Sequence, residues 1–221
     1  MCTYASCYDQ STGKLIGSRK SRTAVLVSAD QRFRAYAESE ATASETTDAS
    51  IPQCQNISKL FVAESAEFRV VLELKPSTEA LGNSIGLIDW SPGGHRLLVA
   101  EGLWQYGSDA GETMARIYDG ETARLSADGF VEEAFCRKFG RKCIGVFQPV
   151  SFSREGGAVI NARPYFDAGE DEPRTESCIQ KEGLWEVDPA TLVVHQLAPS
   201  YRVRHHGRIV SGNPQRQRMP K

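Results

Sequence analysis

A repeat of about 62 residues constrains the fold of this chain more than any other feature of its sequence. Each copy has an apolar segment, a tight turn that opens with serine, and a second apolar segment. A variable loop and two further short segments, joined by a polar turn, complete the copy. Ser28, Ser91 and Ser153 begin the three equivalent turns. The chain is therefore expected to be a repeat protein.

The apolar segments are short, rich in β-branched and aromatic residues, and bounded by Gly, Pro and Asp, which is typical of β-strands. No segment shows sustained 3.6-residue periodicity, so few helices are expected. Four strands in a repeat of this size describe a propeller blade, whereas a β-sandwich would not need three matching units. The expected strands are Thr23–Val27, Phe33–Ala37, Lys59–Val62 and Phe68–Leu72, then Ile85–Trp90, Arg96–Ala100, Ala115–Tyr118 and Thr122–Leu125, then Val146–Phe152, Ala158–Ala162, Leu184–Val187 and Leu192–Leu197.

Two segments resemble the WD-like repeat of TolB-type β-propellers. Ile88–Val99 reads IDWSPGGHRLLV, and Gly183–Thr191 reads GLWEVDPAT. In that repeat a W-S-P-D-G-x-x-L turn precedes the second strand, and an L-W-x-x-D-x-x-T turn joins the third and fourth. The resemblance covers about residues 21–199 as three copies, and it implies blade architecture without indicating a ligand. Gly93 replaces the usual aspartate in the second copy, and the first copy has neither Pro nor Gly in this turn.

The expected fold is an all-β propeller in a single domain of residues 1–210, followed by a basic flexible tail at 211–221. Three blades span about residues 21–75, 84–127 and 145–199. Since propellers typically have four to eight blades, residues 1–17 and 201–210 are expected to form a composite fourth blade. The alternatives are a larger ring made by a homodimer and a fragment of a longer propeller.

Blade wiring places the loops between the second and third strands, and those between blades, on one face. These are the long connections: residues 38–58, 101–114 and 163–182, with 127–144 between the second and third copies. Long loops on a rigid scaffold are where binding usually occurs, although loops of this kind are also tolerated as plain insertions. The acidic third loop lacks the spacing of a calcium site, so no metal is expected. The candidate binding residues are Trp104, Tyr106, Tyr165, Asp167, Glu170 and Asp171.

Signals for catalysis are weak. Residues 82–86 match G-x-S-x-G, but a strand follows the serine where a nucleophile elbow needs a helix. No glycine-rich phosphate loop follows a strand into a helix, so no cofactor is expected. The sequence favours a non-catalytic binding or scaffold propeller that engages a protein or glycan through its long-loop face. The alternative is a propeller-type hydrolase, or the propeller part of a larger peptidase.

A disulfide among the six cysteines would indicate an oxidising compartment. Cys136 and Cys143 flank a short basic segment and are the candidate disulfide, with free buried thiols as the alternative. Cys2, Cys7, Cys54 and Cys178 leave three possible pairings. Disulfides and the TolB resemblance together suggest a periplasmic or secreted protein.

Charge and hydropathy exclude two classes of partner. The net charge of −2 provides no field for nucleic acid or an anionic membrane. No apolar run approaches the roughly 20 residues that a membrane span requires. The basic stretch at residues 201–221 is read as a solvated chain end.

Overall fold

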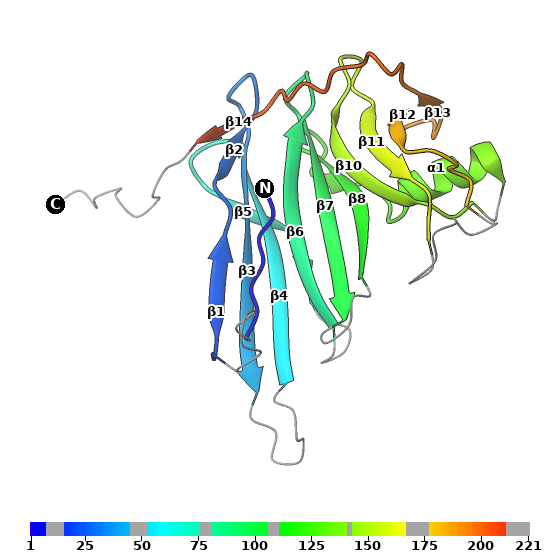
Figure 1. The fold of residues 1–221 in the computed structure, drawn as a ribbon. Coiled ribbons are helices and arrows are strands. Elements are labelled where there is room, and N and C mark those ends of the chain that lie inside the picture. Colours follow the sequence, from blue (N-terminus) through cyan, green and yellow to red (C-terminus); the bar gives the residue numbers. More distant parts are fainter. Residues whose placement is uncertain are drawn as a thin grey trace.

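The computed structural model describes residues 1–7, 16–44, 53–75, 81–105, 111–140, 143–166 and 177–210. Apart from one short helix, the regular structure of these residues is β-strand, arranged in three antiparallel sheets (Figure 1). Each sheet contains the four strands of one sequence copy. The expectations of an all-β fold and of three four-stranded units are confirmed.

The first sheet has the order β14-β2-β3-β4-β5, and β1 also pairs with β3; the other two follow chain order. The elements of the first sheet are β1 (Arg19–Arg22), β2 (Val25–Val27), β3 (Arg34–Ser44), β4 (Gln53–Ala63), β5 (Arg69–Leu74) and β14 (Arg208–Val210). The second contains β6 (Leu81–Trp90), β7 (Arg96–Gln105), β8 (Gly111–Asp119) and β9 (Arg124–Leu125). The third contains β10 (Val146–Phe152), β11 (Ala158–Arg163), β12 (Gly183–Val187) and β13 (Val194–Gln196), and the helix α1 (Phe130–Phe139) precedes it.

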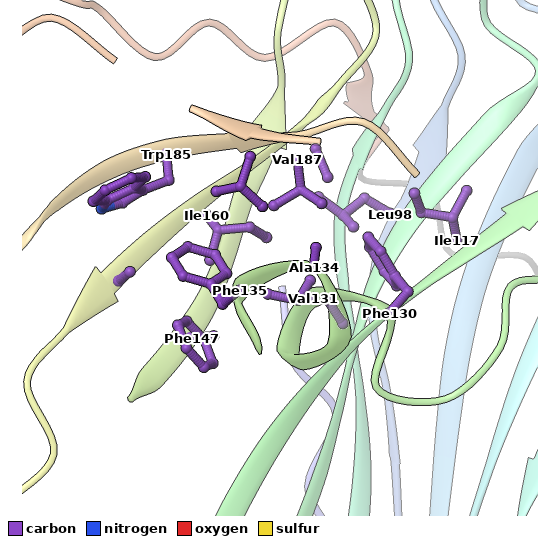
Figure 2. Close-up of a cluster of buried hydrophobic side chains, with 14 of the residues drawn as sticks. Leu98, Ile117, Phe130, Val131, Ala134, Phe135, Phe147, Ile160, Trp185 and Val187 are labelled. Atoms are coloured by element: carbon purple, nitrogen blue, oxygen red, sulfur yellow. The ribbon is translucent and has the colours of Figure 1, made fainter. Parts of the chain in front are cut away.

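The second sheet lies between the other two and buries both of its faces. Side chains of a strand alternate between faces, and β7 is apolar on each of them. Leu97 and Val99 pack in one cluster with residues of the first sheet, such as Leu60. Leu98 belongs to a second cluster with the third sheet and α1, part of which Figure 2 shows. The three units therefore stack face to face through two separate cores.

The helix α1 corrects the expectation that residues 127–144 are a loop. Phe130, Val131, Ala134 and Phe135 form its buried stripe. The Phe135 ring centroid lies 5.5 Å from that of Trp185 in the third sheet. Figure 2 shows this stripe facing Ile160 and Val187. The stripe spans only two turns, too short to register as sustained helical periodicity.

Two of the long connections are largely strand, which also corrects the expected loop lengths. The β3–β4 pairing runs from Arg34↔Ala63 to Ser44↔Gln53, and β7 pairs with β8 from Arg96 to Trp104. Most of residues 38–58 and 101–114 therefore belong to long hairpins. In β3 the inward positions beyond Ala37 hold the small residues Ser39 and Ala41, both fully buried. Small inward residues give little hydrophobic signal, so the sequence pattern does not reveal the alternation there.

The described chain ends do not form a fourth sheet together, so the composite blade is not supported. At the C-terminal end, β14 pairs with β2 in the first sheet. At the N-terminal end, the Met1 carbonyl accepts the Leu87 N–H at 2.6 Å and the Thr3 N–H donates to the Ile85 carbonyl at 3.2 Å, so residues 1–3 run along β6. The three sheets of the described residues do not close into a ring, and the propeller stays a prediction.

The three serine turns share one hydrogen-bond pattern, which explains why serine recurs. In each turn the serine is buried, and its N–H donates to a carbonyl four or five residues later at 2.7–2.9 Å. Its hydroxyl oxygen accepts the N–H of that same residue at 2.9–3.1 Å. The pairs are Ser28 with Phe33, Ser91 with Arg96, and Ser153 with Gly157. The side chain thus closes each turn in place of water.

The third residue after each serine adopts a left-handed backbone, and this predicts an effect of substitution. Gly94 and Gly156 have φ of 78° and 88°, but the first copy has Gln31 at φ 62°. A side chain there costs roughly 1–2 kcal/mol, which glycine avoids at some cost in chain entropy. We expect Gln31→Gly to raise the free energy of unfolding by about 0.5–1 kcal/mol in urea titrations, and Gly156→Ala to lower it. A lower stability of Gln31→Gly would contradict this reading of the turn.

Candidate functional site

A cavity of about 770 Å³ opens beside the third sheet, at the end where its short turns lie. The turn between β10 and β11, strands β12 and β13 with their connecting turn, and the segment after β13 contribute to its wall. Arg96 reaches it from the start of β7 in the second sheet. Its titratable lining residues are Arg96, Glu155, Glu186, Asp188, His195 and Tyr201.

Glu186 and His195 face this cavity because of strand alternation. They are opposite each other in the β12–β13 register. Their neighbours Trp185, Val187 and Val194 point to the opposite face and belong to the core with α1. The Nε2 atom of His195 lies 3.0 Å from Oε2 of Glu186. The two side chains therefore form one cross-strand polar pair on the cavity wall.

The Glu186 carboxylate is nearly buried and is held in place by the serine turn. Its side chain receives a short hydrogen bond from the Ser153 hydroxyl at Oε1. A Cβ atom at position 157 would overlap that same carboxylate, so Gly157 is required for the close approach. The turn that closes the third copy thus also orients Glu186. Among the described hydrogen bonds of the Ser28 and Ser91 hydroxyls, none joins the turn to a carboxylate of a later strand.

Negative charge predominates in the cavity. Glu155, Glu186 and Asp188 line it, against the single guanidinium of Arg96, which donates to the Gly156 carbonyl at 2.9 Å. The pKa of Tyr201 is raised, first by burial and then by the charges of Glu186 and Glu155. Its phenol is therefore neutral at physiological pH, since the nearby carboxylates would repel a phenolate.

Asp188 remains ionised because its own turn stabilises the carboxylate. The backbone N–H of Ala190 donates to Oδ1 at 2.8 Å, and that of Thr191 at 3.3 Å. The Ala190 hydrogen bond is the main reason that the pKa of Asp188 is lowered. Aspartate commonly bonds its own turn in this way. The polar turn between the last two strands of the copy thus contributes a permanent charge to the cavity.

Ser153, Glu186 and His195 converge, but in an order that does not activate a nucleophile. In a serine hydrolase the imidazole lies between hydroxyl and carboxylate and takes the hydroxyl proton. Here the carboxylate lies between the other two groups, and the hydroxyl donates to it. Ser153 is also 1% exposed and closes its own turn. The arrangement fixes a carboxylate rather than preparing an attack.

Among the candidate binding residues from the sequence, Trp104 and Tyr165 lie in the described chain, and the structure places them differently. The Trp104 ring covers Gly82 of β6, where a Cβ would overlap it, and its centroid lies 5.2 Å from that of Tyr4. Trp104 thus packs on its own chain. Tyr165 is exposed, and its N–H donates to the Ser177 hydroxyl at 3.2 Å. Tyr106, Asp167, Glu170 and Asp171 lie outside the described residues.

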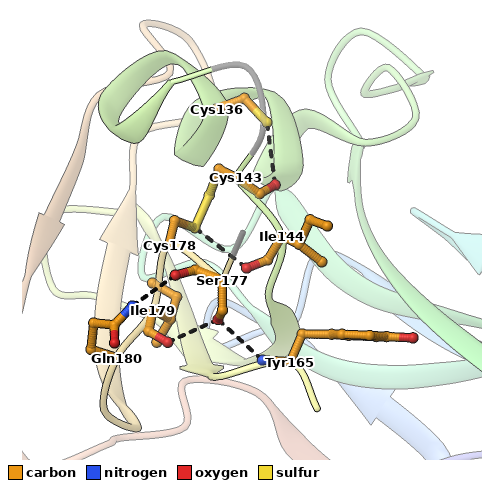
Figure 3. Close-up of a disulfide and its surroundings, with 8 residues drawn as sticks. All are labelled: Cys136, Cys143, Ile144, Tyr165, Ser177, Cys178, Ile179 and Gln180. Atoms are coloured by element: carbon orange, nitrogen blue, oxygen red, sulfur yellow. Dashed lines mark hydrogen bonds between the residues drawn. A yellow bond between two sulfur atoms is a disulfide. The ribbon is translucent and has the colours of Figure 1, made fainter. Parts of the chain in front are cut away.

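The structure corrects the Cys136–Cys143 pairing. Cys143 is bonded to Cys178 instead, and Cys136 is a free thiol at the end of α1 (Figure 3). The reason is a parallel bridge between Ile144 and Ser177, which brings Cys178 beside Cys143. Cys7 and Cys54 form the second disulfide, one of the pairings that the sequence left open. The expectation of disulfides is confirmed.

Sequence reasoning missed the cavity residues. They include Glu186, His195 and Tyr201, none of which is among the candidate binding residues from the sequence. One signal was readable: Glu186 stands between the core residues Trp185 and Val187, so alternation places it on the other face. Arg96 and Tyr201 reach the same cavity only through contacts between parts of the chain that are distant in sequence.

Neither a scan against models of known protein families nor a search of curated proteins gave a match. Within the described ranges, no helix is long and apolar enough to cross a membrane. In the same part of the chain, no three His, Cys, Asp or Glu side chains are grouped so as to hold a metal ion. The class defined by fold and site is thus a three-unit all-β repeat protein with an acidic cavity on its third sheet.

Proposed function

We propose that this protein is a non-catalytic binding or scaffold protein of the β-propeller type, and that it engages a protein or glycan partner. The serine turns and the repeated four-stranded units support the TolB-type interpretation. The two disulfides support a periplasmic or secreted location. Within this proposal, the acidic cavity of the third sheet receives a cationic side chain, lysine or arginine, of a protein partner.

One observation carries the cavity assignment: three carboxylates converge there, and the most buried of them is held in position. Glu186 is oriented by Ser153 and His195 before any ligand arrives. Preorganised carboxylates make charge-assisted hydrogen bonds with guanidinium and ammonium groups. The Tyr201 ring adds an aromatic face of the kind that such cations contact. The cavity volume is within the range of small-ligand sites, large enough for one side chain.

Calorimetric titration with short peptide probes tests the proposal. We expect an acetylated tri-arginine amide to bind, and the corresponding neutral citrulline peptide to bind at least about tenfold more weakly. Glu186→Gln removes the central charge but keeps an acceptor for Ser153, and it should weaken arginine-peptide binding by about tenfold or more.

The matched control is Glu182→Gln. Glu182 is exposed, precedes the same strand, accepts a hydrogen bond from Asn161, and is not part of the cavity wall. It should leave binding unchanged. Equal binding by wild type, Glu186→Gln and Glu182→Gln would show that the peptide binds elsewhere and would overturn the assignment of this cavity.

A further inference from the structure

Three cysteines lie together at the end of α1, and only two of them are bonded. Cys143 and Cys178 form the disulfide, while the thiol of Cys136 contacts the Cys143 carbonyl oxygen at 3.6 Å. Figure 3 shows Cys143 between the other two, with Cys136 on the side away from Cys178. All three residues are partly exposed. A free thiol thus lies beside the residue that carries the disulfide, in contact with its backbone and on the side away from Cys178.

We propose that Cys136 and Cys178 exchange as partners of Cys143, so that this cluster is a switchable disulfide. The inference does not depend on the proposed cavity function. It rests on the contact between Cys136 and Cys143 and on the absence of a disulfide partner for Cys136 in the described structure. Exchange between a thiol and a disulfide proceeds by direct attack of the thiolate on one sulfur.

The reaction balances without any other reagent. The Cys136 thiolate attacks Sγ of Cys143, a Cys136–Cys143 bond forms, and the Cys143–Cys178 bond breaks. Cys178 leaves as a thiolate and takes from solvent the proton that Cys136 gave up. One disulfide and one thiol of this cluster are present before and after, so nothing is oxidised or reduced overall.

Exchange moves a covalent tie from one element to another. The observed disulfide joins Cys143, which lies just after α1, to the segment around Cys178 that leads into β12. After exchange the disulfide joins Cys143 to Cys136 at the end of α1. The segment around Cys178 is then held by non-covalent contacts alone. The Cys178 N–H bond to the Ile144 carbonyl, at 3.1 Å, and the buried side chain of Ile179 remain. The change is therefore local and leaves the sheets in place.

Peptide mapping without reduction tests the exchange, because trypsin separates all three cysteines. Cleavage at arginine and lysine places Cys136 in residues 125–137, Cys143 in 143–154 and Cys178 in 175–181. The parent protein for the experiment carries Cys2→Ser, which removes the other free cysteine. The native protein is labelled with N-ethylmaleimide over a time course at pH 8 and then digested. We expect label on both 125–137 and 175–181, with labelled 175–181 matched by an equal amount of 125–137 linked to 143–154.

Two variants complete the test. Adding Cys136→Ser should reduce the label on 175–181 by at least about tenfold, since no thiol remains to displace Cys178. Adding Cys178→Ser should yield the 125–137 and 143–154 crosslink on air oxidation. Label confined to 125–137 throughout the time course, with all of 143–154 linked to 175–181, would overturn the proposal whether or not the variants fold.

Discussion

Asp89→Ala is expected to lower the free energy of unfolding by about 3–5 kcal/mol, because this fully buried carboxylate fastens the C-terminal segment to the stack. Its Oδ1 accepts the N–H of His206 at 3.0 Å and that of Gly207 at 2.8 Å. The Ser151 hydroxyl of the third sheet lies 3.0 Å from Oδ2. Alanine would leave the N–H groups of His206 and Gly207 without this acceptor. In Figure 1 the segment after β13 crosses the ends of the sheets on its way to β14. Asp89 holds this segment at His206 and Gly207, directly before β14 begins.

Denaturant unfolding and limited proteolysis check this prediction together. The variant should unfold at a lower urea concentration, and trypsin should cut after Arg204 faster than in wild type. Asp188→Ala is the control, because Asp188 also bonds backbone N–H groups but lies in an exposed turn. That change should cost about 1 kcal/mol. An Asp89→Ala midpoint as high as that of wild type would mean that the C-terminal segment does not stabilise the stack.

Trp90→Ala is the second large effect, with an expected loss of about 3–5 kcal/mol. The side chain is fully buried between the first and second sheets, stacked on Phe33 with centroids 5.7 Å apart. Its Nε1–H donates to the Leu26 carbonyl at 3.1 Å, across the sheet interface. Alanine would leave a large cavity in this core and would also remove this hydrogen bond across the interface.

The size of the Trp90 effect separates packing from the hydrogen bond. Trp90→Phe keeps most of the apolar volume but loses the donor, so it should cost about 1–3 kcal/mol in urea unfolding. Trp104→Ala is the control for loss of an indole, and it should cost distinctly less because Trp104 is only half-buried. A Trp104→Ala protein as unstable as Trp90→Ala would contradict the assignment of the core.

Much of the fold could be predicted from the sequence because its cause is local. Alternating β-branched and aromatic residues define the strands, and the serine turns recur in each copy because the same hydrogen bonds close them. The features that were missed depend on contacts between distant residues. The pairing of β14 with β2 joins residues 208–210 to residues 25–27. The helix α1 is stabilised by packing of its buried stripe on the third sheet more than by its intrinsic helix propensity.

Buried polar contacts between the sheets are another feature that the sequence does not reveal. The Asn83 N–H donates to Oδ1 of Asn56 at 2.8 Å, and the Asn56 amide donates to the Ser39 hydroxyl at 2.8 Å. All three residues are at most 1% exposed. In a sequence they are indistinguishable from the polar residues of a loop, which is how residues 38–58 were interpreted. Their partners become apparent only when the first and second sheets are stacked.

The candidate site was predictable only in part, for the same reason. Alternation along β12 and β13 places Glu186 and His195 on one face, and the Asp188 turn follows from its sequence. The hydrogen bond from Ser153 and the approach of Tyr201 require the folded third unit. Cys178 likewise reaches Cys143 only through the bridge between Ile144 and Ser177.

The four histidines allow the most direct measurement of the central claim, that the acidic cavity binds a cationic side chain. His195 lies on the cavity wall, whereas His95, His205 and His206 are not part of its lining. Imidazole NMR signals should be followed while the tri-arginine peptide is added. We expect the His195 signals to shift in a saturable manner while the other three remain in place, and we expect Glu186→Gln to require at least about tenfold more peptide for the same shift. A saturable shift at the other histidines with His195 unmoved would contradict this claim.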